Sequence, residues 1–222
     1  MLVEKEIKNI YLWYWWEPWS NTLAYYPLKS NGNDFSWNSK NGTGYNMTYT
    51  TKDWILCAYF NWSNWYISLP WFWTLSSLTV SLWTNSSYSW SGTNTPFSTW
   101  PSTDNANFQI YNNATSLDAS RWNWSNSDYL SSGYDCTDWT RHNIVVSNGS
   151  DWLKIYADWI LKASSNNVRT VKSDNWYCFI WYWRSPIYYL WYISNVIVEN
   201  KVWTATEVLN YYNGTKSLYW IS

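Results

Sequence analysis

HNIVVSNGSDWLKIYADWILKA, which spans residues 142–163, decides the fold. Three short apolar runs at residues 144–146, 153–156 and 160–163 are separated by a Ser-Asn-Gly-Ser turn and by an Asp-Trp pair. Strand-length apolar runs bounded by Gly, Asn, Asp and Ser are typical of antiparallel strands joined by tight turns. The stretch therefore predicts three strands in a meander.

Two more strands and one helix are predicted on the C-terminal side. Residues 179–182 and 192–198 are short runs rich in aromatic and β-branched side chains, which favour strands. Thr204 is a suitable N-cap residue, Glu207 stands at the capping-box position and Gly214 follows as a stop signal. We therefore predict a short C-terminal helix that begins after Thr204.

Alternating hydrophobicity indicates strands in the first half of the chain as well. Residues 78–83 alternate apolar and hydroxyl side chains, which predicts a half-buried strand with Leu78, Val80 and Leu82 on one face. Short apolar runs predict further strands at residues 23–28, 57–61, 66–70 and 108–111.

Turns and polar regions complete the prediction. The runs at 57–61 and 66–70 flank a tight Asn-rich loop, so we expect them to pair as a hairpin. Residues 86–104 and 121–138 are rich in Ser, Thr and Asn and are predicted to be rim loops. The fold class that follows is all-β: an antiparallel two-sheet jelly-roll sandwich with one short C-terminal helix, formed by residues 21–222 after an N-terminal arm, residues 1–20.

Composition limits the classes of partner. The 222 residues suit one sandwich, and 14 Lys and Arg against 15 Asp and Glu leave a formal charge of −1. Because the basic residues are scattered, we expect no nucleic-acid partner. The first segment, MLVEKEIKNIYLW, contains neither a signal-peptide core nor a membrane span, so we expect no membrane insertion. Of the three cysteines, Cys57 and Cys178 stand in apolar runs and are predicted to be buried.

The sequence has 24 tryptophans but only 7 glycines. Several tryptophans directly follow Asn or Asp, as Trp54, Trp62 and Trp159 do, where tight turns favour glycine. We hypothesise that UGA codons meaning glycine were translated as tryptophan. Trp83 and Trp203 stand in patterned apolar contexts and are interpreted as genuine tryptophans, as is Trp139. The alternative is an aromatic-rich chain whose rings stack on ligands.

The order of these elements resembles the concanavalin A-like lectin/glucanase superfamily in its laminin G-like form. The motifs that carry the resemblance are HNIVVS at 142–147, LKIYADWIL at 153–161, FIWY at 179–182, YISNVIV at 192–198 and AYFNWSNWYI at 58–67. In this match Trp159, Trp181 and Trp191 stand where the family prefers glycine. Arg141 replaces a frequent aromatic residue of the family. The tryptophan-rich composition and the N-terminal arm, residues 1–20, also resemble those of surface-associated or phage proteins from lineages that read UGA as glycine.

The sequence offers little for catalysis. A retaining glycosidase needs two carboxyl groups about 5–5.5 Å apart, and no closely spaced pair of acids occurs on a predicted strand. His142 has no paired nucleophile and is predicted to be a packing residue. No cofactor motif is present. Calcium is the one metal considered, through rim-loop aspartates whose spacing matches no loop motif. These aspartates are Asp104, Asp128, Asp135 and Asp138.

The favoured function is therefore a non-catalytic carbohydrate-binding or adhesion module. Rim loops that carry aromatic rings, amides and charges stack on and hydrogen-bond to sugars, and the 121–138 region offers Arg121, Tyr129, Tyr134 and Asp135. The alternative is a structural or protein-interaction module of a virion or surface assembly, and a glycoside hydrolase ranks third. We expect an extracellular or virion-surface location and a glycan or surface polysaccharide as partner.

Overall fold

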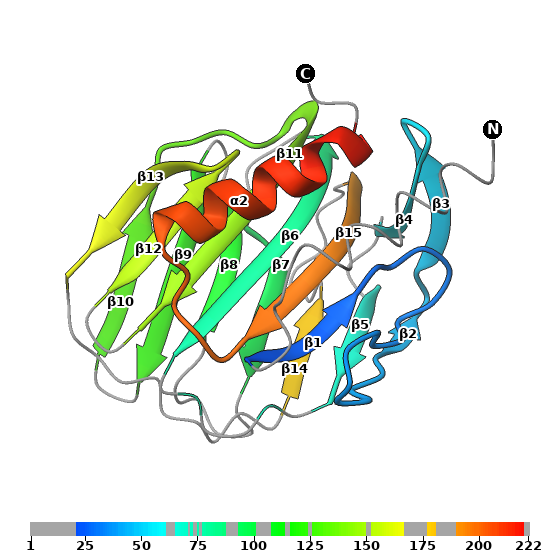
Figure 1. Ribbon diagram of the computed structural model, residues 1–222, viewed down its shortest axis with the longest axis horizontal. Coiled ribbons are helices and arrows are strands. Elements are labelled where there is room, and N and C mark those ends of the chain that lie inside the picture. The colour runs from blue at the N-terminus through cyan, green and yellow to red at the C-terminus, as the bar shows by residue number, and fades with distance from the viewer. Residues whose placement is uncertain are drawn as a thin grey trace.

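The protein is a two-sheet β-sandwich with one C-terminal helix (Figure 1). The computed structural model describes residues 21–60, 65–70, 72, 75, 77–87, 93–100, 108–113, 116–123, 126–149, 152–166, 177–180 and 190–219. Every strand pair in both sheets is antiparallel. The predicted fold class is confirmed, while residues 1–20 lie outside the described residues.

An eight-stranded sheet has the order β13-β12-β11-β6-β15-β4-β3, and β1 pairs with β15. Its strands are β1 (Thr22–Tyr26), β3 (Thr48–Lys52), β4 (Ile55–Phe60), β6 (Leu78–Ser87), β11 (Asp138–Asn148), β12 (Leu153–Ala157), β13 (Ile160–Ser165) and β15 (Leu190–Glu199). The predicted meander is confirmed, because β11 pairs with β12 and β12 with β13.

A seven-stranded sheet forms the second layer, in the order β10-β9-β8-β7-β14-β5-β2. Its strands are β2 (Thr43–Tyr45), β5 (Tyr66–Leu69), β7 (Thr93–Trp100), β8 (Phe108–Asn113), β9 (Ser116–Asn123), β10 (Asn126–Ser131) and β14 (Tyr177–Ile180). The main core lies between the sheets, where the predicted inward residues Leu78, Val80 and Leu82 are all buried.

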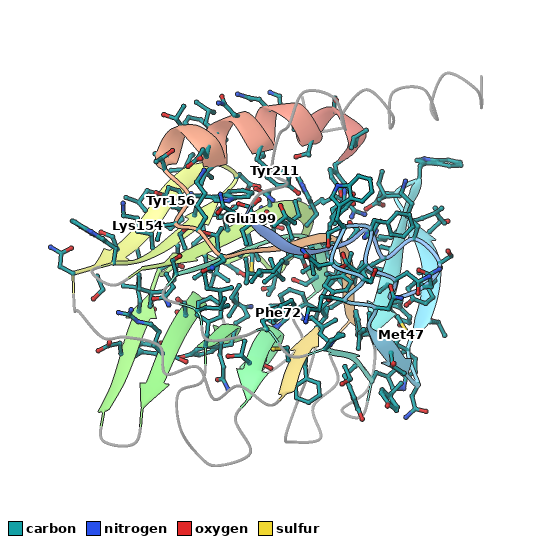
Figure 2. All side chains as sticks on the ribbon, turned by 60° about the horizontal axis from the view of Figure 1, so that its bottom comes forward. Met47, Phe72, Lys154, Tyr156, Glu199 and Tyr211 are labelled. Atoms are coloured by element: carbon teal, nitrogen blue, oxygen red, sulfur yellow. The ribbon has the colours of Figure 1, made fainter. Side chains whose placement is uncertain are left out.

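Helix α2 (Ala205–Lys216) and the short 3-10 helix η1 (Ser217–Tyr219) cover the outer face of the eight-stranded sheet (Figure 1). The Thr204 hydroxyl caps the helix and Glu207 completes the capping box, as predicted. A second apolar cluster forms beneath α2, and Tyr156 and Tyr211 belong to it, whereas Phe72 belongs to the core between the sheets (Figure 2). Trp83 and Trp203 are also buried in this second cluster.

Two details of the predicted topology are wrong. The runs at 57–61 and 66–70 do not pair, because β4 belongs to the eight-stranded sheet and β5 to the other. The regions 86–104 and 121–138 are not simply loops, since β7 lies in the first and parts of β9 and β10 lie in the second. Buried hydroxyl side chains, such as Thr95 and Ser98 on β7, occupy these strands and hide the apolar alternation.

Two of the three Asp-Trp pairs of the described chain form nearly identical tight turns. Asp53 and Trp54 join β3 to β4 with φ values of 51° and 65°, and Asp158 and Trp159 join β12 to β13 with 50° and 65°. Two central residues with positive φ are the mark of a type I′ hairpin turn, for which Asp-Gly is strongly preferred. Trp139, interpreted above as a genuine tryptophan, has a φ of 66° as well. Trp62 and Trp181 lie outside the described residues.

The tryptophans of the sheet interior behave differently. Trp191, which the resemblance aligned with glycine, is fully buried in the main core on β15. The three cysteines are free and buried, as predicted for Cys57 and Cys178. In the described part of the chain, no helix is long and apolar enough to cross a membrane.

Candidate functional site

A cavity of about 490 Å³ opens at one end of the eight-stranded sheet. The β3–β4 turn contributes Asp53, the end of β6 contributes Asn85, and the start of β11 contributes Arg141. The β12–β13 turn contributes Asp158, and Tyr219 of η1 closes the side next to the helix. Turns from distant parts of the sequence therefore meet here because β3, β6, β11 and β12 share one sheet.

Arg141 lies on the outer face of β11 and is only 8% exposed. Its Nη2 donates to the Lys52 carbonyl at 3.0 Å, and its guanidinium carbon lies 5.2 Å from the centroid of the Tyr219 ring. That ring is itself held by stacking on Trp83, with centroids 4.0 Å apart. The guanidinium is thus fixed in place, while its buried Nη1 has no hydrogen-bond partner among the described residues.

Asn85 is the direct cross-strand partner of Arg141 in the β6–β11 register and is 1% exposed. Its amide Nδ2 donates to Asp53 Oδ2 at 3.1 Å and to the Trp139 carbonyl at 3.0 Å. Its Oδ1, by contrast, has no donor within the described chain. The cavity therefore holds one buried donor and one buried acceptor that the described residues leave unsatisfied.

His142 forms a second polar group at the same end of the sandwich. Its Nδ1 lies 2.6 Å from Asp158 Oδ2, and its Nε2 lies 3.0 Å from Asp138 Oδ1. Burial lowers the pKa of His142, but the hydrogen bond and charge of Asp158, followed by those of Asp138, outweigh it and raise that pKa above its ordinary value. The hydrogen bonds of Asp138 to Thr140 and His142 lower the pKa of Asp138 despite partial burial. His142 thus packs as predicted, within an ionic cluster.

Of the four residues predicted to bind sugar, Tyr134 contacts the His142 group directly. Its hydroxyl lies 3.1 Å from Asp158 Oδ2 and 3.1 Å from His142 Nδ1. Burial, followed by the charge of Asp158, raises the pKa of Tyr134. Lys162 lies over its ring, 4.2 Å from the centroid.

The other three predicted residues are separate. Arg121 is buried and pairs with Asp128 at 3.4 Å, and its Nη1 donates to Asn148 Oδ1 at 2.6 Å. It therefore links the seven-stranded sheet to the end of β11. Tyr129 is exposed on β10, where its hydroxyl donates to an aspartate, while Asp135 Oδ1 accepts from the backbone of Thr137.

The calcium candidates do not gather into one site. Asp128 is engaged by Arg121, Asp135 by Thr137, and Asp138 by Thr140 and His142. Within the described ranges, no group of three or more His, Cys, Asp or Glu could hold a metal ion. Asp104 lies outside those ranges.

Sequence reasoning missed Arg141 and Asn85 as site residues. Arg141 was noticed only as a departure from the resembled family, because an arginine in a polar segment is usually solvated. Asn85 gave no signal, since asparagine is common throughout this chain. Their pairing depends on the β6–β11 register and on the position of η1, which the sequence pattern does not reveal.

Proteins of known structure share this architecture. The binding domain of Paraclostridial Mosquitocidal Protein 1 matches with a TM-score of 0.75 and 13% identity, over 89% of this chain and 53% of that one. Domain 4 of AbnA, a GH43 extracellular arabinanase from Geobacillus stearothermophilus solved in complex with arabinotriose, matches with a TM-score of 0.70 and 17% identity, over 86% and 97%. This chain shares their fold.

Botulinum neurotoxin type C, whose capacity to enter cells is dependent upon interaction with two ganglioside molecules, matches with a TM-score of 0.72 and 12% identity, over 88% of this chain and 51% of that one. The protein thus spans about half the length of the toxin chains that it matches. No family model and no curated protein matches the sequence. At these identities the structural neighbours establish the fold alone.

Proposed function

We propose that the protein is a non-catalytic carbohydrate-binding or adhesion module. The observation that carries the proposal is the cavity, where Arg141 Nη1 and Asn85 Oδ1 are buried without hydrogen-bond partners among the described residues. A volume of about 490 Å³ falls within the range of small-molecule sites. A sugar supplies both acceptors and donors on adjacent carbons, which suits a site that presents one of each.

A glycan array tests the proposal. The full chain is screened with and without calcium, and bound glycans are then titrated by calorimetry. We expect binding that is lost in Asn85→Leu, while Ser164→Leu on the distal strand β13 serves as a control for added apolar volume. A folded protein that binds nothing across the array would contradict the proposal.

We also propose a second place for sugar contact among Arg121, Tyr129, Tyr134 and Asp135, where Tyr129 and Asp135 are exposed and the buried Arg121 would act only through Asp128. Tyr129 presents an exposed ring, and exposed aromatic rings stack on sugars. If this surface binds, Tyr129→Ala abolishes binding and Asn85→Leu leaves it intact. The opposite result assigns binding to the cavity.

A protein-interaction module is the second candidate function, favoured by one edge of the eight-stranded sheet. β13 is an edge strand, and Trp159, Ile160 and Leu161 at its start are exposed, with Trp152 exposed just before β12. Exposed apolar side chains beside a free edge favour contact with another protein. Light scattering tests this candidate: a stable oligomer that dissociates on Leu161→Lys would favour it over glycan binding.

We further propose an extracellular or virion-surface setting and keep the laminin G-like assignment as a hypothesis about the family. The fold is compatible with both, and one structural neighbour is a domain of an extracellular enzyme. Proteomics of purified virions and of culture supernatant from the source organism would locate the protein. Recovery only from cell interiors would contradict this setting.

Finally, we propose that Trp54, Trp139 and Trp159 are glycine in the natural protein, through a UGA codon read as glycine. The support is the positive φ of all three, 65°, 66° and 65°. Bulky residues avoid this region, whereas glycine enters it freely. The codons decide the matter, because UGG at these positions would exclude recoding.

A further inference from the structure

We propose that the cavity binds a sugar that carries a carboxylate, such as a uronate or a sialate, and that Arg141 pairs with that carboxylate. The inference rests on the proposed function and narrows it to one chemical class of ligand. It starts from a charge that has no counter-charge among the described residues.

Arg141 is buried, with 8% of the residue exposed, and its Nη1 is fully buried. No ion pair within the described ranges includes it. Its described contacts are the carbonyl of Lys52, the face of the Tyr219 ring and the side chain of Cys57, none of which is a carboxylate. Buried charges in proteins are normally paired, because desolvation of an isolated ion costs several kcal/mol.

The acids around the cavity are already engaged. Asp53 Oδ1 pairs with Lys52 at 2.9 Å, and its Oδ2 accepts from the Asn85 amide. Asp158 and Asp138 both hold His142. An incoming anion can therefore pair with Arg141 without displacing a carboxylate of the described residues.

The unsatisfied acceptor Asn85 Oδ1 determines which ligand group must lie next to the anion. Asn85 Oδ1 is an acceptor and requires a donor, and Asn85 is the cross-strand partner of Arg141. A bare anion such as phosphate in its fully ionised form offers acceptors only. A carboxylate on a carbon skeleton that also carries hydroxyl groups offers both, and acidic sugars have this structure.

The inference does not depend on the tryptophans. Arg141 is held by a backbone carbonyl and a tyrosine ring, and Asn85 by an aspartate and a backbone carbonyl. The Trp139 contribution to Asn85 is its carbonyl oxygen, which glycine also possesses. These contacts of Arg141 and Asn85 are therefore available in either version of the chain.

The test compares matched sugars on the full-length protein. Binding of 3′-sialyllactose, lactose, a glucuronate-containing disaccharide and arabinotriose is measured by calorimetry and by saturation-transfer NMR. We expect at least one acidic sugar to bind more tightly than lactose and arabinotriose, by on the order of tenfold to a hundredfold, which is the range of a charge-assisted hydrogen bond.

Two variants assign the effect to the cavity. Arg141→Gln is expected to abolish the preference for the acidic sugar, and Arg141→Lys to keep part of it because the charge remains. Lys154→Gln, which removes a positive charge on β12 away from the cavity, is the control and should bind as the parent does. Thermal unfolding of each variant verifies that it is folded.

Each result separates the inference from the proposed function. If lactose or arabinotriose binds as well as the acidic sugars, or if Arg141→Gln keeps the acidic preference, the inference is overturned and the glycan-binding function stands. If neither acidic sugar binds but a neutral glycan on the array does, the inference is overturned in the same way. Silence across all sugars overturns both.

Discussion

The two Asp-Trp turns allow a direct test of whether the fold requires glycine at these positions. The perturbation is a pair of substitutions, Trp54→Gly and Trp54→Ala, in the β3–β4 turn, where φ is 65°. Both variants remove the same indole, which is 84% exposed and contributes little burial. Their difference in stability therefore reports on the backbone alone.

The magnitude follows from two opposing terms. A residue with a Cβ atom in the left-handed region costs about 1–2 kcal/mol, which alanine incurs and glycine avoids. Glycine costs about 0.5–1 kcal/mol relative to alanine because its unfolded chain is more flexible. At position 54 glycine should therefore exceed alanine in stability by roughly 0.5–1 kcal/mol, which corresponds to about 1–4 °C in Tm for a chain of this size.

Trp37 supplies the matched control. It is 85% exposed, and it is absent from the residues with positive φ. At this position only the entropy term applies, so alanine should exceed glycine by roughly 0.5–1 kcal/mol. Urea unfolding of the four variants measures both differences. If the glycine-minus-alanine difference has the same sign at positions 37 and 54, the reasoning about the turn is refuted.

Four further outcomes are expected. Raising the pH from about 6 to 8.5 should lower the free energy of unfolding. The stabilisation by protonated His142 is complete below its unfolded pKa of about 6.5 and is lost as the pH rises through its raised folded pKa. Urea titrations across this pH range should show the decrease in the parent and not in His142→Gln. Arg121→Ala should cost about 3–5 kcal/mol by removing the positive charge that buried Asp128 faces. Thr204→Ala should cost about 1 kcal/mol, and Thr204→Ser should restore it. Trp83→Ala should cost about 3–5 kcal/mol, measured by Tm.

Each of these expectations has a contrary result. A pH slope that persists in His142→Gln would mean that another group titrates in this range. An Arg121→Ala variant as stable as the parent would show that Asp128 finds solvent or another partner. Equal stability of the alanine and serine variants at Thr204 would assign no role to the capping hydroxyl. A Trp83→Ala variant with the Tm of the parent would show that this indole contributes little to the cluster beneath α2.

The sequence predicted the parts of the fold that alternate clearly. The strands around 144–146, 153–156 and 78–83 bury aliphatic residues at every second position, so their period was visible. The sequence pattern did not predict β7, β9 and β10, where buried hydroxyl and charged residues replace aliphatic ones. Asp118 and Arg121 on β9 are both buried, and each has polar partners supplied by other strands. Burial of such residues depends on those partners, which a local pattern cannot reveal.

The candidate site was predictable in chemistry but not in position. The sequence predicted a site in which an arginine, tyrosines and carboxylates lie near one another. The structure has such a group around Arg141, whereas the prediction had named Arg121. The two arginines look alike in sequence, since each stands in a polar segment. What separates them is pairing: Arg121 meets Asp128 across the β9–β10 hairpin, whereas the cross-strand partner of Arg141 is a neutral amide, Asn85.

This difference connects the recoding question to the function. If Trp54, Trp139 and Trp159 are glycine, the mouth of the cavity loses the indole of Trp139, and both neighbouring turns relax. Hydrophobic stacking by these rings would then be no part of the natural site. The charge of Arg141 would remain, because the β6–β11 register and the Tyr219 ring hold it. Recognition that survives in a protein carrying glycine at all three positions, and that still requires Arg141, would therefore be ionic in origin.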